Sequence, residues 1–331
     1  MPKLAYYVTS HGYGHFLRTL EIIKDFKGWE IWILTDFNKI DITEFHDEVS
    51  FQTRHSVIDI GVVQHDALEI DIEQTLEKNL ELEQQEKQIL QREVDFIHSE
   101  NIDIIFSDIP PLAFKIAQLA GIPCYGVSNF SWDWIYDGLA HYHRDYLRFS
   151  VKFYNFYQMA AGLFQLPFAG PMRAFKKIYR MGLVRRSPAI KSPQQIRKLL
   201  NIPQDAKVML LTFGGQEYLP PLRKIEGLLY LVPGKVDRRM RDSYIEVSTK
   251  NFSHPDLVVA SDIIFSKPGY GILSEIWDLP KLFIYTDRGP FREYEVLKKY
   301  IEKHIPSSIY IPSSAVRDGS WLSMVESKIF Y

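Results

Sequence analysis

The chain has 331 residues, 46% hydrophobic and 24% charged, with a formal net charge of −2. That length suits about two globular domains, and near-neutrality argues against nucleic-acid binding. The single cysteine, Cys124, excludes an internal disulfide and a cysteine-based zinc site, so we expect a reducing, cytoplasmic compartment. We expect no export signal and no membrane span, because no apolar run approaches the ~20 residues that a spanning helix needs.

Short runs of β-branched and aromatic residues alternate with helical segments in the first half, which is typical of parallel βαβ units. Strands are expected at residues 4–8, 30–34, 51–60, 101–106 and 123–127, and helices at 16–27, 68–100 and 112–120. The alternation resumes with strands at 208–212, 228–232, 262–265 and 281–285 and helices at 257–260 and 274–278. The long helix at 68–100 has an acidic outer face.

Prolines and glycines interrupt this alternation between Pro167 and Pro193. We therefore predict an α/β fold of two Rossmann-like domains with a cleft between them. The first domain is expected at residues 1–165, the linker at 166–190 and the second domain at 191–331. The last helix is a candidate to return to the first domain.

A glycine-containing loop, Ser10-His-Gly-Tyr-Gly-His15, joins the first strand to the first helix. Its glycines permit a tight turn, and the helix N-terminus beside it offers free amides to an anion. A dinucleotide fingerprint needs a third glycine where this chain has Leu17. Asp36, after the second strand, could still bind a ribose, so a nicotinamide-dependent oxidoreductase remains an alternative.

Two histidines, His11 and His15, lie at the carboxyl edge of the sheet, where ligands of such folds bind. Asp108 follows another strand on the same edge, so it could hold the His15 imidazole in one tautomer and raise its basicity. The alternative is that Asp108 caps the helix after Pro110 and Pro111. The histidine spacing does not form a zinc-helix motif, and we expect no metal.

Two further loops end strands of the second half, Thr212-Phe-Gly-Gly-Gln216 and Ser266-Lys-Pro-Gly-Tyr-Gly271. Each presents small residues and free amides where a phosphate could lie, although neither matches the P-loop pattern. Glu275, in the helix that follows the second loop, could accept both hydroxyls of a ribose. The alternative is a solvated acid that favours the helix dipole.

Taken together, these segments resemble the GT-B nucleotide-sugar glycosyltransferases. They are most similar to the glycosyltransferase-like N-terminal domain of L-arabinokinase-type proteins, and more distantly to the UDP-GlcNAc transferase that makes the lipid intermediate of peptidoglycan. The matching segments are 6–15, 61–68, 106–108, 128–133, 213–216 and 267–271. Each is weak alone, but six in this order are specific and cover most of the chain.

The resemblance implies a metal-independent, inverting transfer of a sugar from a nucleoside diphosphate, with UDP expected, to an unidentified hydroxyl acceptor. It implies His15 as the general base and Asp108 as the acid that orients it. The implied donor-binding residues are Gly14, Gly214, Gly215, Gln216, Phe252, Ser253, Ser266, Lys267, Gly269, Tyr270, Gly271, Glu275, Arg292 and Glu293. The implied acceptor-side residues are His11, His65, Asp66, Asn129 and Trp132.

The resemblance implies no cofactor, since the nucleotide sugar is a co-substrate. Arg292 and Glu293 depart from the acid-glutamine pair with which family members reach the donor sugar, so the sugar stays open. A non-catalytic nucleotide-sugar-binding module is the main alternative, ahead of the oxidoreductase and of a nucleotide-sugar epimerase.

The near-neutral charge is a cancellation between two segments. Residues 65–108 hold thirteen acidic and three basic residues, a net charge of −10, whereas residues 144–200 hold twelve basic residues and one acid, a net charge of +11. The basic segment is also rich in aromatic residues. One hypothesis is that it contacts an anionic inner membrane surface or a phosphorylated acceptor; the alternative is a solvated face paired with the acidic helix.

Overall fold

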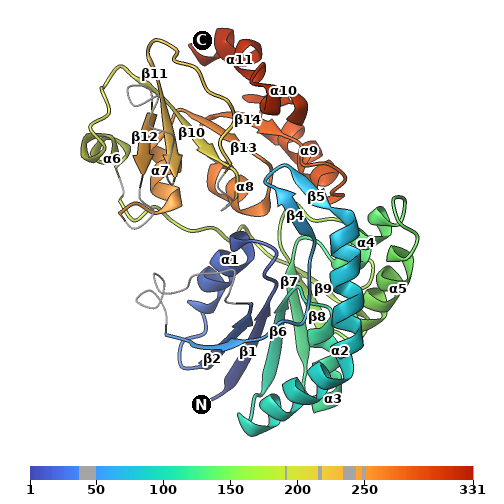
Figure 1. The fold of residues 1–331 in the computed structure, drawn as a ribbon. Coiled ribbons are helices and arrows are strands. Elements are labelled where there is room, and N and C mark those ends of the chain that lie inside the picture. Colours follow the sequence, from blue (N-terminus) through green and yellow to red (C-terminus); the bar gives the residue numbers. More distant parts are fainter. Residues whose placement is uncertain (37–49, 191, 215–217, 234–243, 248–250, 331) are drawn as a thin grey trace. The chain divides into compact units, whose positions relative to one another are not determined.

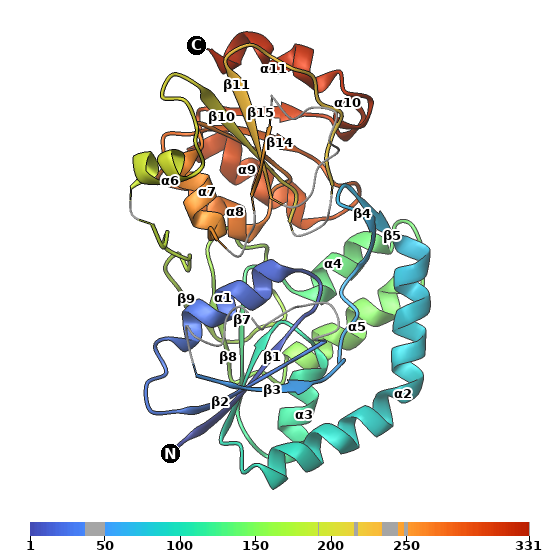
Figure 2. The same ribbon diagram turned by 60° about the vertical axis from the view of Figure 1, so that its left-hand side comes forward.

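The computed structural model describes residues 1–36, 50–190, 192–214, 218–233, 244–247 and 251–330 (Figures 1 and 2). These residues divide into two compact units. Unit 1 comprises Met1–His65, Ile70–Val184 and Pro290–Val296, and unit 2 comprises Asp66–Glu69, Arg185–Gly289 and Leu297–Tyr331.

Unit 1 is built on a parallel sheet of seven strands. Their order across the sheet is β3 (Gln52–His55), β2 (Glu30–Thr35), β1 (Lys3–Val8), β6 (Ile104–Asp108), β7 (Cys124–Ser128), β8 (Gly162–Gln165) and β9 (Ile178–Arg180). The chain runs outward from β1 to β3 and then returns to β6 on the other side of β1. The strand order therefore reverses between β1 and β6, where Val8 lies opposite Asp108, and ligands bind at such a point in α/β sheets.

Helices cover both faces of this sheet. They are α1 (Tyr13–Ile23), α2 (Ile72–Ser99), α3 (Leu112–Ala120), α4 (Trp132–Leu139) and α5 (Tyr146–Tyr157). Helix α1 lies over one face and α2 and α3 over the other (Figure 2). Strand β1 is buried on both faces, which explains its continuous apolar sequence, as expected for a central parallel strand. A two-stranded sheet, β4 (Val63–Asp66) and β5 (Glu69–Asp71), precedes α2.

Unit 2 is built on a second parallel sheet, of six strands. Their order is β12 (Tyr244–Val247), β11 (Leu228–Pro233), β10 (Lys207–Thr212), β13 (Ile263–Ser266), β14 (Leu282–Thr286) and β15 (Ser308–Ile311). Its helices are α6 (Pro193–Leu199), α7 (His254–Ala260), α8 (Tyr270–Ile276), α10 (Ser313–Asp318), α11 (Trp321–Ile329) and the part of α9 (Glu293–His304) that follows Val296. Here the strand order reverses between β10 and β13, where Thr212 lies opposite Ser266.

The prediction of an α/β protein with two parallel sheets is confirmed, but several boundaries differ. Unit 1 extends to Val184 rather than residue 165, because β9 pairs with β8 and completes the first sheet inside the expected linker. The later segment that belongs to unit 1 is Pro290–Val296, whereas α11 packs Trp321 into the core of unit 2. The first helix begins at Tyr13, earlier than expected, because Gly12 is its N-cap.

We expect Gly61→Ala to destabilise unit 1 more than Gly121→Ala does. Both glycines have positive φ, +65° and +74°, so alanine at either position costs about 1 kcal/mol of backbone strain. A Cβ at Gly61 would also lie 2.9 Å from Cβ of His11, whereas a Cβ at Gly121 meets no atom within 4 Å. Urea unfolding should show about 2 kcal/mol of additional loss for Gly61→Ala. Equal losses would contradict the tight packing against His11.

Candidate functional site

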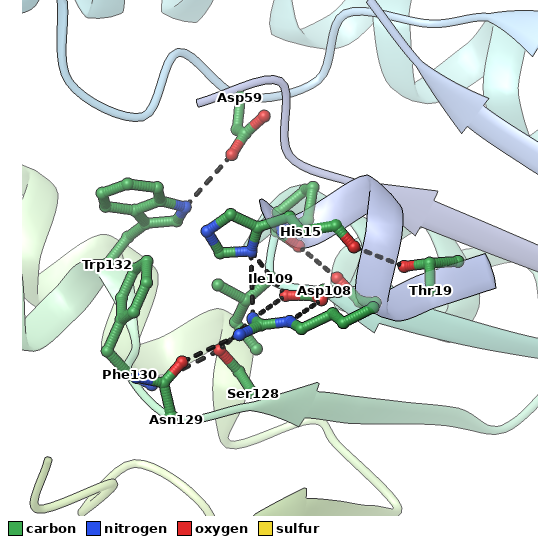
Figure 3. Close-up of polar contacts among 12 residues, drawn as sticks. His15, Thr19, Asp59, Asp108, Ile109, Ser128, Asn129, Phe130 and Trp132 are labelled. Carbon is green, nitrogen blue, oxygen red and sulfur yellow. Dashed lines mark hydrogen bonds and ion pairs between the residues drawn. The ribbon is translucent and has the colours of Figure 1, made fainter. Parts of the chain in front are cut away.

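The two predicted catalytic residues of unit 1 lie side by side. His15 is in the first turn of α1, which follows β1, and Asp108 is the last residue of the neighbouring strand β6. Nδ1 of His15 lies 2.8 Å from Oδ1 of Asp108, and the other ring nitrogen is on the far side of the ring (Figure 3). Asp108 is fully buried, and His15 is only 8% exposed.

Arg18, which the sequence reasoning missed, holds the same carboxylate from α1. Its Nε donates to Oδ2 of Asp108 at 2.5 Å, and its Nη2 donates to Oδ1. Arg18 is three positions after His15, so both side chains are on one face of the helix. An arginine at that spacing from a candidate base was the available signal. The alternative role for Asp108 is wrong, because α3 has Pro111 as its N-cap without a side-chain cap.

Burial and charge act in opposite directions on this pair. Burial favours the neutral form of Asp108, but Arg18 and His15 outweigh it and lower the pKa of this carboxyl. The pKa of His15 is also lowered, by burial first and by Arg18 second, although Asp108 acts to raise it. Asp108 therefore acts on the basicity of His15 in the expected direction, but burial and Arg18 outweigh it. Folding disfavours protonated His15, so its contribution to stability is present above the unfolded pKa of about 6.5 and is lost as the pH falls through the folded value.

The position of the proton on His15 follows from its partner. An ionised carboxylate only accepts hydrogen bonds, so the contact at 2.8 Å requires the proton on Nδ1. Nη2 of Arg18, 3.0 Å from Nδ1, then donates to the same carboxylate oxygen rather than to the ring. Nε2 of the neutral imidazole carries the free lone pair and can act as a base.

Two more buried side chains extend this cluster. Nη1 of Arg18 donates to Oδ1 of Asn129 at 2.9 Å, and Nδ2 of Asn129 donates to Oε1 of Glu293 at 2.8 Å. The sequence placed Asn129 on the acceptor side and both Glu293 and Arg292 on the donor side. All three belong to unit 1: Asn129 and Glu293 are hydrogen-bonded to each other, and Arg292 donates to the carbonyl of Trp134 at 3.1 Å.

Aromatic rings line the side of the cluster next to His11. The imidazole of His11 stacks on Phe291 with 5.6 Å between ring centroids and meets Trp132 edge-on at 5.3 Å. Phe130 contacts His15 edge-on at 5.5 Å. Trp132 is 1% exposed and donates from Nε1 to Asp59 at 3.1 Å (Figure 3). Its ring therefore supports the packing of His11 and offers no open face to a ligand.

For three other expected residues, Gly14, His65 and Asp66, the structure describes no hydrogen bond with the side chains of the His15 cluster. Gly14 is exposed in the first turn of α1, and His65 is exposed on β4. Asp66 belongs to unit 2, where Arg317 donates to both of its oxygens at 2.7 and 3.1 Å. Although its partial burial opposes ionisation, the hydrogen bonds from Arg317 lower the pKa of Asp66.

Unit 2 has a second set of polar side chains in contact with one another, beginning at the end of β10, where the strand order of its sheet reverses. Oε2 of Glu275, in α8, lies 2.6 Å from Nδ1 of His254, the first residue of α7. Nε2 of His254 lies 2.9 Å from Oγ1 of Thr212, the last residue of β10. Arg186 approaches the other oxygen of Glu275 at 3.6 Å. The Glu275 side chain is only 8% exposed, so its interpretation as a solvated acid is wrong.

The loop after β13 combines a buried lysine with open space. Lys267 donates to the carbonyl of Ala67 at 3.0 Å, and burial, with the charge of Arg288, lowers its pKa to about 7. A Cβ added at Gly269 or at Gly271 would meet no atom within 4 Å. The remaining predicted residues of this loop, Ser266 and Tyr270, are buried beside it.

Three other predicted donor residues have defined places in unit 2. Gly214 has φ of +78°, and a Cβ there would lie 3.1 Å from Cε of Lys267. Ser253 caps α7 in a capping box with Asp256, and Phe252 precedes it half-buried. Gly215 and Gln216, predicted on the donor side, lie outside the described residues.

The basic segment is partly paired with the acidic helix. Glu83 on α2 accepts from Lys152 of α5 at 2.9 Å and from Arg148, and Glu86 accepts from Lys152. Among the described residues, no helix has the length and apolar character that a bilayer crossing requires. Within those same ranges, no three His, Cys, Asp or Glu side chains gather in the manner of a metal site.

Comparison with known proteins gives one curated relative and many solved structures. No family model matches the chain. L-arabinokinase of Arabidopsis thaliana is 33% identical over 308 residues, which cover 90% of this chain and 29% of that protein. The chain thus spans less than a third of the length of this homologue.

The solved structures cover nearly the whole chain. UGT89C1 of Arabidopsis thaliana complexed with quercetin has a TM-score of 0.64 at 13% identity, covering 99% of this chain and 89% of its own. CalG4, the calicheamicin glycosyltransferase, has a TM-score of 0.62 at 13% identity, covering 99% and 90%. Phytolacca americana UGT2, complexed with UDP-2fluoro-glucose and pterostilbene, has a TM-score of 0.59 at 11% identity, covering 94% and 85%. At such identities the similarity shows the fold.

Replacing Arg18 by Met should raise the pKa of His15, because a positive charge beside the ring is removed while Asp108 stays. The variant should also lose about 3–5 kcal/mol of stability, since Asp108 is left buried with less compensation. Titration of the histidine ring signals by NMR measures the first effect. Arg54→Met, which removes the partner of buried Glu93 in the same unit, is the control and should leave the His15 pKa unchanged. A lower pKa in the Arg18 variant would refute the assignment.

Proposed function

Because the chain has the GT-B glycosyltransferase fold, we propose that it is a glycosyltransferase that transfers a sugar from a UDP-sugar donor to a hydroxyl acceptor. The observation that carries the proposal is the buried pair of His15 and Asp108. Nδ1 of His15 lies 2.8 Å from Oδ1 of Asp108, beside the point where the strand order of the first sheet reverses. The solved complex of similar fold with UDP-2fluoro-glucose supports the choice of a uridine nucleotide.

The reaction is a single displacement with inversion. As the acceptor oxygen bonds to the anomeric carbon, the bond from that carbon to the diphosphate breaks, and Nε2 of His15 takes the hydroxyl proton. Asp108 holds the imidazole in the tautomer that leaves Nε2 free and stabilises the imidazolium that forms. The lowered pKa of His15 keeps the ring neutral at pH 7, so it is ready to accept the proton.

Unit 2 supplies the groups for the leaving diphosphate. The amides of the loops after β10 and β13 would stabilise its growing negative charge. Lys267, with a pKa of about 7, would become more fully protonated beside a diphosphate, because the anion favours the charged ammonium. Glu275 would accept the ribose hydroxyls. The proposal uses no metal and no cofactor.

The acceptor remains a hydroxyl compound of unspecified structure. The ion pairs of Arg148 and Lys152 with α2 favour a solvated, internally paired face for that part of the basic segment over a membrane contact.

Nucleotide binding tests the proposal first. We expect UDP to raise the Tm of the protein, since a ligand that binds only the folded state stabilises it, whereas NAD(H) should leave the Tm unchanged. A rise in Tm with NAD(H) but not with UDP would contradict the proposal and favour the oxidoreductase.

Turnover then separates an enzyme from a binding module. With a panel of UDP-sugars, UDP release should fall about a hundredfold or more in His15→Gln, because the base is lost, while UDP affinity stays unchanged. His98→Gln, an exposed histidine of α2 in the same unit, is the matched control and should keep full activity. A wild-type protein that binds UDP but releases none from any donor is a binding module instead.

A further inference from the structure

One chain of polar contacts in unit 2 joins the predicted Glu275 to three residues that the sequence analysis did not select as site residues: Thr212, His254 and Arg186. Thr212, His254 and Glu275 are joined at 2.9 and 2.6 Å through the two nitrogens of the imidazole, and Arg186 approaches Glu275 at 3.6 Å. These side chains come from the end of β10, the start of α7, the last turn of α8 and the start of the Arg185–Gly289 segment of unit 2. His254 is therefore the connection between β10 and α8.

The imidazole of His254 is fixed at both of its nitrogens. The carboxylate of Glu275 accepts from Nδ1–H, so in the neutral ring Nε2 is free to accept the hydroxyl proton of Thr212. The Glu275 side chain is 8% exposed and that of His254 is 28% exposed, so water does not fully replace the contact between them. Because the ring is held at two points, it restrains the rotation of the Glu275 carboxylate about its last bond.

A restrained carboxylate has consequences for a diol. The two oxygens of an ionised carboxylate offer about four acceptor positions. His254 occupies one and Arg186 faces another, which leaves two positions for the two hydroxyls of a ribose. A rotated carboxylate could still bind one hydroxyl but would lose the paired geometry.

We propose that His254 is a positioning residue that, with Thr212, orients Glu275 for recognition of the ribose diol of the donor nucleotide. This inference rests on the proposed function and adds the group that sets selectivity for a ribonucleotide over its 2′-deoxy counterpart. The Thr212 contact also ties this recognition to β10, whose following loop carries Gly214.

The test is the ratio of two dissociation constants, for 2′-deoxy-UDP and for UDP, measured by calorimetry on the whole chain. A hydrogen bond to a charged group is worth about tenfold to a hundredfold in affinity, so the wild-type ratio should lie in that range. Glu275→Gln should reduce the ratio, and His254→Ala should reduce it to a similar value. In a chain that already carries Glu275→Gln, His254→Ala should have no further effect on the ratio.

Three variants separate this role from a merely structural one. His254→Asn keeps a donor near Glu275 and should retain most of the selectivity, whereas Thr212→Val removes one anchor of the ring and should reduce it in part. His304→Ala, an exposed histidine of the same unit, should keep the wild-type ratio. A general loss of packing would weaken both nucleotides equally and leave the ratio unchanged.

The outcomes are distinct. If wild-type protein binds UDP selectively and the folded His254→Ala and Thr212→Val variants keep the full ratio, the positioning role is overturned while the proposed function stands. If the ratio falls equally in His304→Ala, the role is likewise overturned. If the wild type does not bind UDP, the proposed function fails, and this inference fails with it.

Discussion

A fully buried carboxylate at the end of β6 stays charged because Arg18 binds both of its oxygens. Without a cation at that place, burial would favour the protonated acid, and a protonated Asp108 would have no reason to fix the tautomer of His15. The same guanidinium holds Asn129, and through it Glu293, so one arginine organises side chains from α1, β6, the end of β7 and α9. It does so at a cost to basicity, since its charge also lowers the pKa of His15.

The two units share one arrangement, in which a histidine at the start of a helix contacts a polar residue at the end of a strand. In each, the strand order reverses beside the first strand, and a polar residue ends a strand at that point: Asp108 in β6 and Thr212 in β10. A histidine from the start of a helix then contacts that residue, His15 in unit 1 and His254 in unit 2. In unit 1 the acid fixes the imidazole so that its free nitrogen can take a proton. In unit 2 the imidazole contacts both an acid, Glu275, and the hydroxyl of Thr212, so both of its nitrogens are engaged.

Much of the fold could be predicted because it depends on local patterns. The apolar run of β1, the glycines of the loop after it and the polar face of α2 each act within a few residues, so the α/β class and most strands of both sheets follow from them. The edge strand β9 could not be found in this way. Its side chains are exposed and its neighbours include Pro167 and Pro171, so only pairing with β8 defines it.

For the candidate site, too, some features follow from the sequence and others only from the tertiary structure. The sequence by itself determined that His15 and Asp108 lie where a strand meets the following loop or helix, and that Glu275 lies in the helix after such a loop, because these positions depend on order along the chain. Only the tertiary structure decided which groups meet them: Arg18 on Asp108, Glu293 on Asn129 and His254 on Glu275. Those contacts join residues up to 164 positions apart. Burial and paired charge at such contacts set the protonation of each group, and neither can be read from residues that are neighbours in sequence.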